Sequence, residues 1–134
     1  MKYPRIWIAT YYPDRELFAA QDSKAPPAVL AFLALAQDWH VRWGVGGNES
    51  TPPDVLRTLA DDPHNRVAMA VAWNPKTPAD VVKRLARHKY WEVRLKIAER
   101  YDVPLEILKE LVEDESKFVV EKARAVTGAD EVTL

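Results

Sequence analysis

Residues 51–78 read TPPDVLRTLADDPHNRVAMAVAWNPKTP, and the TPPDVL at the start of this stretch returns as TPADVV at residues 77–82. The two copies begin at Thr51 and Thr77, and other positions keep the same step along the chain. Prolines and leucines recur at this step at Pro26, Pro52, Pro78 and Pro104 and at Leu33, Leu59, Leu85 and Leu111. Such a fixed period indicates an array of tandem repeats, each of which buries its apolar face against its neighbours.

Each repeat is predicted to contain two short helices. Val55 and Leu59, one helical turn apart, mark the apolar face of the first helix, and Val67 and Val71 mark that of the second. The sequence DDP after the first helix and the sequence NP after the second are stop signals. The repeat unit is therefore helix, turn, helix, turn.

The threonine–proline pairs predict where first helices begin. Thr51 and Thr77 precede prolines and are biased away from helical dihedral angles, so their hydroxyl groups are expected to cap the helices that follow. Asp54, Asp80 and Glu106 then fall in the first turn, where the helix dipole favours negative charge. Helix stabilisation explains these carboxylates without a catalytic role.

The stretch TPPDVLRTLADDPHNRVAMAVAWNPKTP resembles the leucine-rich repeat variant family. The resemblance implies a right-handed solenoid, related to HEAT repeats, whose units pair a short and often 3₁₀ helix with an α-helix. The founding member of that family carries a cysteine-ligated iron–sulfur cluster, but this chain has no cysteine, so no cofactor is expected. HEAT-like arginines stand at Arg42 and Arg94, while Ala68 and Val120 at the matching positions interrupt an arginine ladder.

The predicted fold is an all-α solenoid of four repeats with an N-terminal cap. The array runs from residue 25 to 126, with repeats at about 27–52, 53–78, 79–104 and 105–126, and a tail follows at 127–134. Residues 1–24 are too apolar for a solvated tail and are expected to form the cap that a solenoid end needs. Within them, RIWIATYY at 5–12 is compatible with a strand or a helix, and the neighbouring helical array favours the helix.

Composition narrows the function classes. The chain has 134 residues, enough for one domain, and its formal net charge of −1 gives no overall attraction to nucleic acid or anionic membrane. The longest apolar run, residues 25–36, is far shorter than a membrane span, and the N-terminus is unlike a secretory signal. The protein is expected to be cytoplasmic and not to bind membranes.

Large apolar side chains on the second helices are the main candidates for function. Residues two positions after the core valines point away from the core, and neighbouring tryptophans lie one turn from them on the same side. The predicted set is Trp39, Trp43, Met69, Trp73, Trp91 and Leu95. Tryptophan-rich apolar surfaces are typical of binding hot spots, so a protein or peptide partner, or a second copy of the chain in a homodimer, is predicted. The alternative is that residues 1–24 or another copy cover these side chains as part of a core.

A basic region offers a second hypothesis, in which the protein is a nucleic-acid-binding HEAT-like module. The candidate basic face is Arg66, Lys83, Arg87, Arg94, Lys96 and Arg100, with Tyr90 and Trp91 interleaved. Against it, the repeat register places Glu113 beside Arg87, so that pairing between repeats neutralises part of the charge.

Catalysis has little support in the sequence. His40, His64 and His88 recur at a step two positions shorter than the repeat, so they drift across the register instead of gathering as metal ligands. The glycines of GVGG at 44–47 lack the preceding strand of a phosphate-binding loop, and a packing role is predicted for them. The chain is therefore expected not to be an enzyme and to need neither a metal nor a cofactor.

Overall fold

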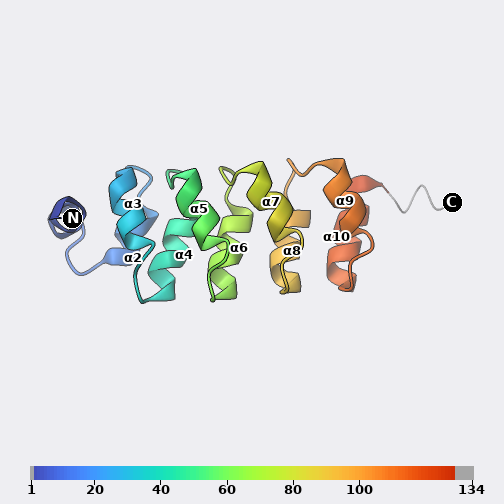
Figure 1. Cartoon of the computed structure of the whole chain (residues 1–134), viewed down its shortest axis with the longest axis horizontal. Helices are drawn as coiled ribbons and strands as arrows, with labels where there is room; N and C mark the ends of the chain where they lie inside the picture. Colours follow the sequence, from blue (N-terminus) through green and yellow to red (C-terminus); the bar gives the residue numbers. More distant parts are fainter. Residues whose placement is uncertain (1, 129–134) are drawn as a thin grey trace. The chain divides into compact units, whose positions relative to one another are not determined.

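The structure is a computed structural model that describes residues 2–128 (Figure 1). Ten α-helices make up the secondary structure of these residues, and no strand occurs among them. The all-α prediction is confirmed. The ambiguous segment 5–12 is helical, because α1 runs over Lys2–Tyr11.

The helices alternate between shorter first helices and longer second helices. The first helices are α3 (Pro27–Leu33), α5 (Pro53–Leu59), α7 (Ala79–Leu85) and α9 (Leu105–Leu111), and their starts keep the step of the sequence repeat. The second helices are α4 (Trp39–Gly47), α6 (Asn65–Trp73), α8 (Trp91–Ala98) and α10 (Lys117–Thr127). The first helices are α-helices and not the 3₁₀-helices that the family resemblance allows, and no 3₁₀-helix occurs between residues 2 and 128.

Contacts divide the chain into an N-terminal unit, residues 1–78, and a C-terminal unit, residues 79–134. In the N-terminal unit α2 (Glu16–Gln21) packs on α4, α4 packs on α6, and α1 packs on α3 (Figure 1). In the C-terminal unit α10 packs on both α8 and α9. Of the predicted tail 127–134, Thr127 ends α10 and Gly128 follows it as a left-handed C-cap, and the remaining positions lie outside the described residues.

The recurring apolar positions form the core, as the register predicts. Every residue in the leucine column and in the two valine columns of the second helix is buried. These residues are Leu33, Leu59, Leu85, Leu111, Val41, Val67, Val93, Val119, Val45, Val71, Ile97 and Ala123. Val55 is the exception among the first-helix positions, since it is only half-buried. The period of burial therefore matches the period of the sequence.

The threonine–proline turns work differently from the prediction. Thr51 Oγ1 donates to the carbonyl oxygen of Val45 at 2.6 Å, and Thr77 Oγ1 donates to that of Val71 at 2.6 Å. The N-cap of α5 is Pro52, which has no side-chain cap bond. The capping prediction was wrong because each hydroxyl reaches back to a carbonyl in the last turn of the preceding second helix, which also accepts from the C-cap amide of Asn48 or Asn74.

Asparagine side chains connect successive turns in the N-terminal unit. Asn48 Nδ2 donates to the carbonyl oxygens of Ala20 and Asp22, both at 2.8 Å. Asn74 Nδ2 makes the equivalent bonds to Gly46 and Asn48, both at 2.9 Å. Both asparagines are buried. Pairs of backbone carbonyls thus anchor the turn at Asn48 to the end of α2, and the turn at Asn74 to the equivalent turn of the preceding repeat.

Two glycines allow α4 to pack closely between α2 and α6. A Cβ atom at Gly44 would lie 3.0 Å from Ala20 Cβ and 3.2 Å from Leu17 Cδ1 on α2. A Cβ atom at Gly46 would lie 3.3 Å from Val71 Cγ2 on α6. The glycine run is therefore a packing feature of the helix that carries Trp39 and Trp43.

Candidate partner-binding surface

The second helices of the N-terminal unit begin at defined caps. Asp38 Oδ1 accepts from the N–H of His40 at 2.9 Å at the start of α4, and His64 Nδ1 accepts from the N–H of Arg66 at 3.2 Å at the start of α6. These bonds satisfy amide groups that have no intrahelical acceptor. The caps set where each helix starts, and thereby which side chains follow the buried valines on the outer side.

The structure exposes much of the predicted tryptophan set. Trp43 is 39% exposed, Trp73 is 57% exposed and Trp91 is 37% exposed, whereas Trp39, Met69 and Leu95 are half-buried. Helices α1 and α2 lie against α3 and α4, and Trp43 and Trp73 remain exposed in their presence. Four of the six side chains belong to α4 and α6 in the N-terminal unit, and the other two to α8 in the C-terminal unit.

Trp39 stacks with two histidines that sequence reasoning did not bring together. Its ring centroid lies 3.8 Å from that of His40, at 23°, and 3.9 Å from that of His64, at 13°. The two histidines do not occupy the same position in their repeats. His64 is the N-cap residue that precedes α6, whereas His40 lies inside α4 near its start. The indole of Trp39 nevertheless contacts both imidazoles.

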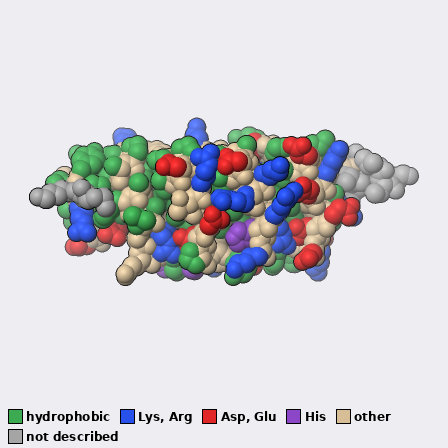
Figure 2. All heavy atoms as spheres, in the orientation of Figure 1, with side chains coloured by type: hydrophobic (Ala, Val, Ile, Leu, Met, Phe, Trp, Pro, Cys, Tyr) green, Lys and Arg blue, Asp and Glu red, His purple; other side chains and the backbone are tan. Residues whose placement is uncertain are grey.

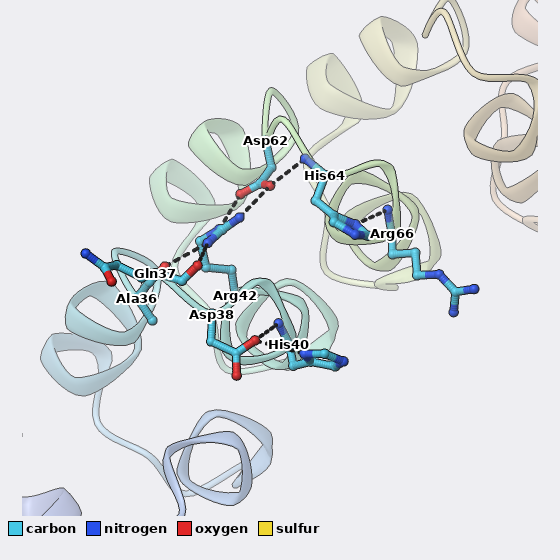
Figure 3. Close-up of polar contacts among 8 residues, drawn as sticks. All are labelled: Ala36, Gln37, Asp38, His40, Arg42, Asp62, His64 and Arg66. Carbon is cyan, nitrogen blue, oxygen red and sulfur yellow. Dashed lines mark hydrogen bonds and ion pairs between the residues drawn. The ribbon is translucent and has the colours of Figure 1, made fainter.

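The arrangement around His64 is held by a two-pronged ion pair (Figure 3). Arg42 Nε lies 2.7 Å from Asp62 Oδ2 and its Nη2 lies 3.2 Å from Oδ1. Arg42 Nη1 also donates to the carbonyl oxygens of Ala36 and Gln37. Asp62 Oδ1 in turn accepts from the N–H of His64 at 2.9 Å. The guanidinium thus fastens two successive turns and orients the residue that stacks on Trp39.

The C-terminal unit contains the same clamp, two repeats further along the chain. Arg94 Nε lies 2.7 Å from Asp114 Oδ2, and its Nη2 lies 3.0 Å from Oδ1. Nη1 donates to the carbonyl oxygens of His88 and Lys89, and Asp114 Oδ1 accepts from the N–H of Ser116. The arginine ladder is therefore interrupted at Ala68 and Val120, as the sequence predicts. Arg42 and Arg94, the two arginines that are present, each pair with an aspartate.

Ion pairing shifts the pKa values of these groups. The hydrogen bond to Asp62 raises the pKa of Arg42 against the opposing effect of burial, and Asp114 raises that of Arg94 in the same way. Burial raises the pKa of Asp114, but the hydrogen bonds from Arg94 and from the Ser116 amide, together with the Arg94 charge, bring it below its usual value. Arg42, Arg94 and Asp114 therefore stay ionised at neutral pH.

Most of the candidate basic face is engaged in ion pairs. Arg87 Nη2 lies 2.8 Å from Glu110 Oε1, and not beside Glu113 as the register placed it. Arg94 is held by Asp114, and Arg100, which is only 6% exposed, lies 2.8 Å from Asp102. Lys96 lies 3.4 Å from Glu99, while Arg66 and Lys83 are exposed. On the face shown in Figure 2, side chains of both charge signs mix over α7 and α9, and hydrophobic ones gather over α1 and α3.

Phe118 and its surroundings are part of the surface that the sequence reasoning missed. Trp91 and Phe118 stack with their ring centroids 5.1 Å apart at 26°, and they line a shallow depression of about 430 Å³. Phe118 occupies the repeat position of Arg66 and His40, so no repeated pattern marked it as apolar. Its signal in the sequence is only an aromatic residue next to a lysine at a helix start.

Two further site classes find no support in the described part of the chain. Between residues 2 and 128, no group of three or more histidine or acidic side chains is placed to hold a metal ion. Within the same range, every helix is too short or too polar to cross a membrane.

No protein-family model, curated protein or solved structure matches this chain.

Proposed function

We propose that this chain is a non-enzymatic, cytoplasmic helical-repeat protein that binds a protein or peptide partner, or a second copy of itself, through the outer side of its second helices. We further propose that its repeats form a right-handed solenoid of the leucine-rich repeat variant type. The proposed contact residues are Trp39, Trp43, Met69, Trp73, Trp91 and Leu95.

One observation carries the proposal: large tryptophan side chains are exposed where the repeat needs no apolar residue. Trp43 lies two positions after buried Val41 on α4, and Trp73 lies two positions after buried Val71 on α6, which packs on α4. More than a third of each tryptophan is exposed. Tryptophan is enriched at binding hot spots because it removes a large apolar area from water and keeps an N–H donor. The clamps and glycine contacts described above hold these helices in place, so little ordering is required when a partner binds.

The proposal is tested by selecting peptides from a random display library on the wild-type protein. Selected peptides are expected to lose at least about tenfold in affinity for the double variant Trp43→Asp with Trp73→Asp. Thr58→Asp, an exposed position on first helix α5, serves as the matched control and should bind normally. Circular dichroism checks that the variants fold. Peptides that bind all three proteins equally would contradict the proposal.

Self-association is distinguished by measuring the solution mass by light scattering. A wild-type dimer that becomes a folded monomer in the variant Trp43→Asp with Leu95→Lys would identify the partner as a second copy. A variant that unfolds would show that these side chains are core, and it would contradict the proposal.

A further inference from the structure

Two aromatic side chains line the depression in the C-terminal unit. Trp91 at the start of α8 and Phe118 at the start of α10 stack on each other, yet 37% and 49% of their side chains remain exposed. The depression is also lined by Lys89 and by the turn residues Glu115 and Ser116. All of these residues belong to the C-terminal unit.

The equivalent place in the N-terminal unit is occupied by the protein itself. Trp39 corresponds to Trp91 at a distance of two repeats, and His64 corresponds to Ser116. The imidazole of His64 stacks 3.9 Å from Trp39, whereas Ser116 has no ring and the stacking partner of Trp91 is Phe118, at 5.1 Å. Both turns are held alike, because an aspartate accepts from the backbone N–H of His64 and of Ser116. The two places therefore differ at three positions around the tryptophan, because Glu92, Ser116 and Phe118 replace His40, His64 and Arg66, and Trp91 stacks with Phe118 in place of the two imidazoles.

The charges around the depression favour a small number of negative groups. Lys89 and Lys117 both line the depression, and Lys117 Nζ lies 5.3 Å from the ring centroid of Phe118. The charge of Arg94 is balanced by Asp114, and Glu115 adds a negative charge at the rim. A nucleic-acid strand, with a charge on every phosphate, would be repelled by the Glu115 carboxylate. The C-terminal unit also carries about as many acidic as basic residues. A ligand with one or two carboxylates therefore fits the depression better than a nucleic acid does.

We propose that this depression docks a short acidic peptide, with an aromatic or aliphatic side chain against Trp91 and Phe118 and neighbouring carboxylates against Lys89 and Lys117. The inference rests on the proposed partner-binding function and specifies the partner's chemistry in the C-terminal unit. A volume of about 430 Å³ accommodates one large side chain with its flanking backbone.

The test is an NMR titration of the isotope-labelled full chain with the peptide acetyl-Ser-Asp-Phe-Glu-Ser-amide. We expect the backbone amide signals of residues 115–118 and the indole N–H of Trp91 to shift. A control peptide with Asn and Gln in place of the acids should bind at least about tenfold more weakly, and so should one with Ala in place of Phe. The variant Ser116→His, which copies His64, is expected to cover Trp91 and remove binding, and Lys117→Glu to weaken it at least about tenfold. Unchanged amide signals from residues 79–87 and 105–111, in the same C-terminal unit but outside the depression, show that both variants fold.

The alternative outcomes separate this inference from the proposed function. Absence of shifts at residues 115–118 at millimolar peptide, or equal binding of the Asn/Gln peptide, would overturn the acidic-peptide site. Shifts confined to the α4 and α6 tryptophans would also overturn it, while leaving partner binding by the second helices intact. A single-stranded DNA oligonucleotide that shifts the same amides and displaces the peptide would assign the depression to nucleic acid instead. The library selection on Trp43 and Trp73 fails or succeeds independently of all these results.

Discussion

Arg42 and Asp62 come from successive repeats, and their side chains meet through two parallel N–H···O contacts of 2.7 and 3.2 Å. The same geometry joins Arg94 to Asp114. In the repeat between them, Ala68 stands at the arginine position and His88 at the aspartate position, so both partners are replaced together. A poorly solvated charge without a partner is costly, which explains why the pair is present or absent as a unit.

The Arg42–Asp62 pair is predicted to contribute strongly to stability. Only 16% of the Arg42 side chain and 5% of the Asp62 side chain are exposed. Arg42→Ala should lower the free energy of unfolding by about 2 to 4 kcal/mol, because it leaves Asp62 and two carbonyl oxygens without their donor. Urea unfolding of both single variants and the double variant measures the coupling. Additive losses would contradict a direct interaction.

Asp114 is predicted to make stability sensitive to acid. Its folded pKa lies below its usual value of about 3.9, so the folded state binds fewer protons than the unfolded state between the two values. The resulting stabilisation is complete above the unfolded pKa and is lost as the pH falls through the folded pKa. Urea unfolding between about pH 6 and about pH 3 should show this loss, and Asp114→Asn should show a smaller one.

Other carboxylates retain part of the acid sensitivity in that variant. Hydrogen bonds to Arg100 and Arg87 lower the pKa values of Asp102 and Glu110, respectively. The difference between wild type and Asp114→Asn therefore isolates Asp114. If the two proteins lost stability in parallel on acidification, the clamp would have no role in it.

The leucine column is predicted to dominate the core energetics. Leu59 and Leu85 are almost fully buried, on α5 and α7 respectively. Leu59→Ala or Leu85→Ala should cost about 2 to 5 kcal/mol because each leaves a cavity. Arg57→Ala, at an exposed position on α5, should cost less than about 1 kcal/mol. Similar costs at all three positions, measured by urea unfolding, would invalidate the register.

Two glycines on α4 provide a matched test of its packing against α2. Gly44→Ala places a methyl group 3.0 Å from Ala20 Cβ, so α2 must shift, and we expect a net loss of about 1 kcal/mol despite the better helix propensity. A Cβ atom at Gly47 would contact nothing within 4 Å. Gly47→Ala should therefore leave stability unchanged or raise it by up to about 1 kcal/mol. A stabilised Gly44→Ala protein would mean that α2 is not docked as described.

The sequence by itself determined the positions of the helices and most of the core. The first helices start at the constant step of the repeat, and the leucine column and the two valine columns of the second helices are buried throughout. This was predictable because helix periodicity and apolar spacing are local properties of the chain. The tryptophans of the second helices were identified in the same way, from their position relative to buried valines.

Only the tertiary structure decided how side chains pair between turns. Thr51 bonds back to Val45, Arg87 selects Glu110, and His64 covers Trp39 although the histidines do not share a register position. Such choices depend on rotamers and on distances between packed helices, which shift partners by about one helical turn without changing the period. The surroundings of Trp91 are of this kind, because its stacking partner is Phe118 on α10, whereas that of Trp39 is the N-cap residue His64.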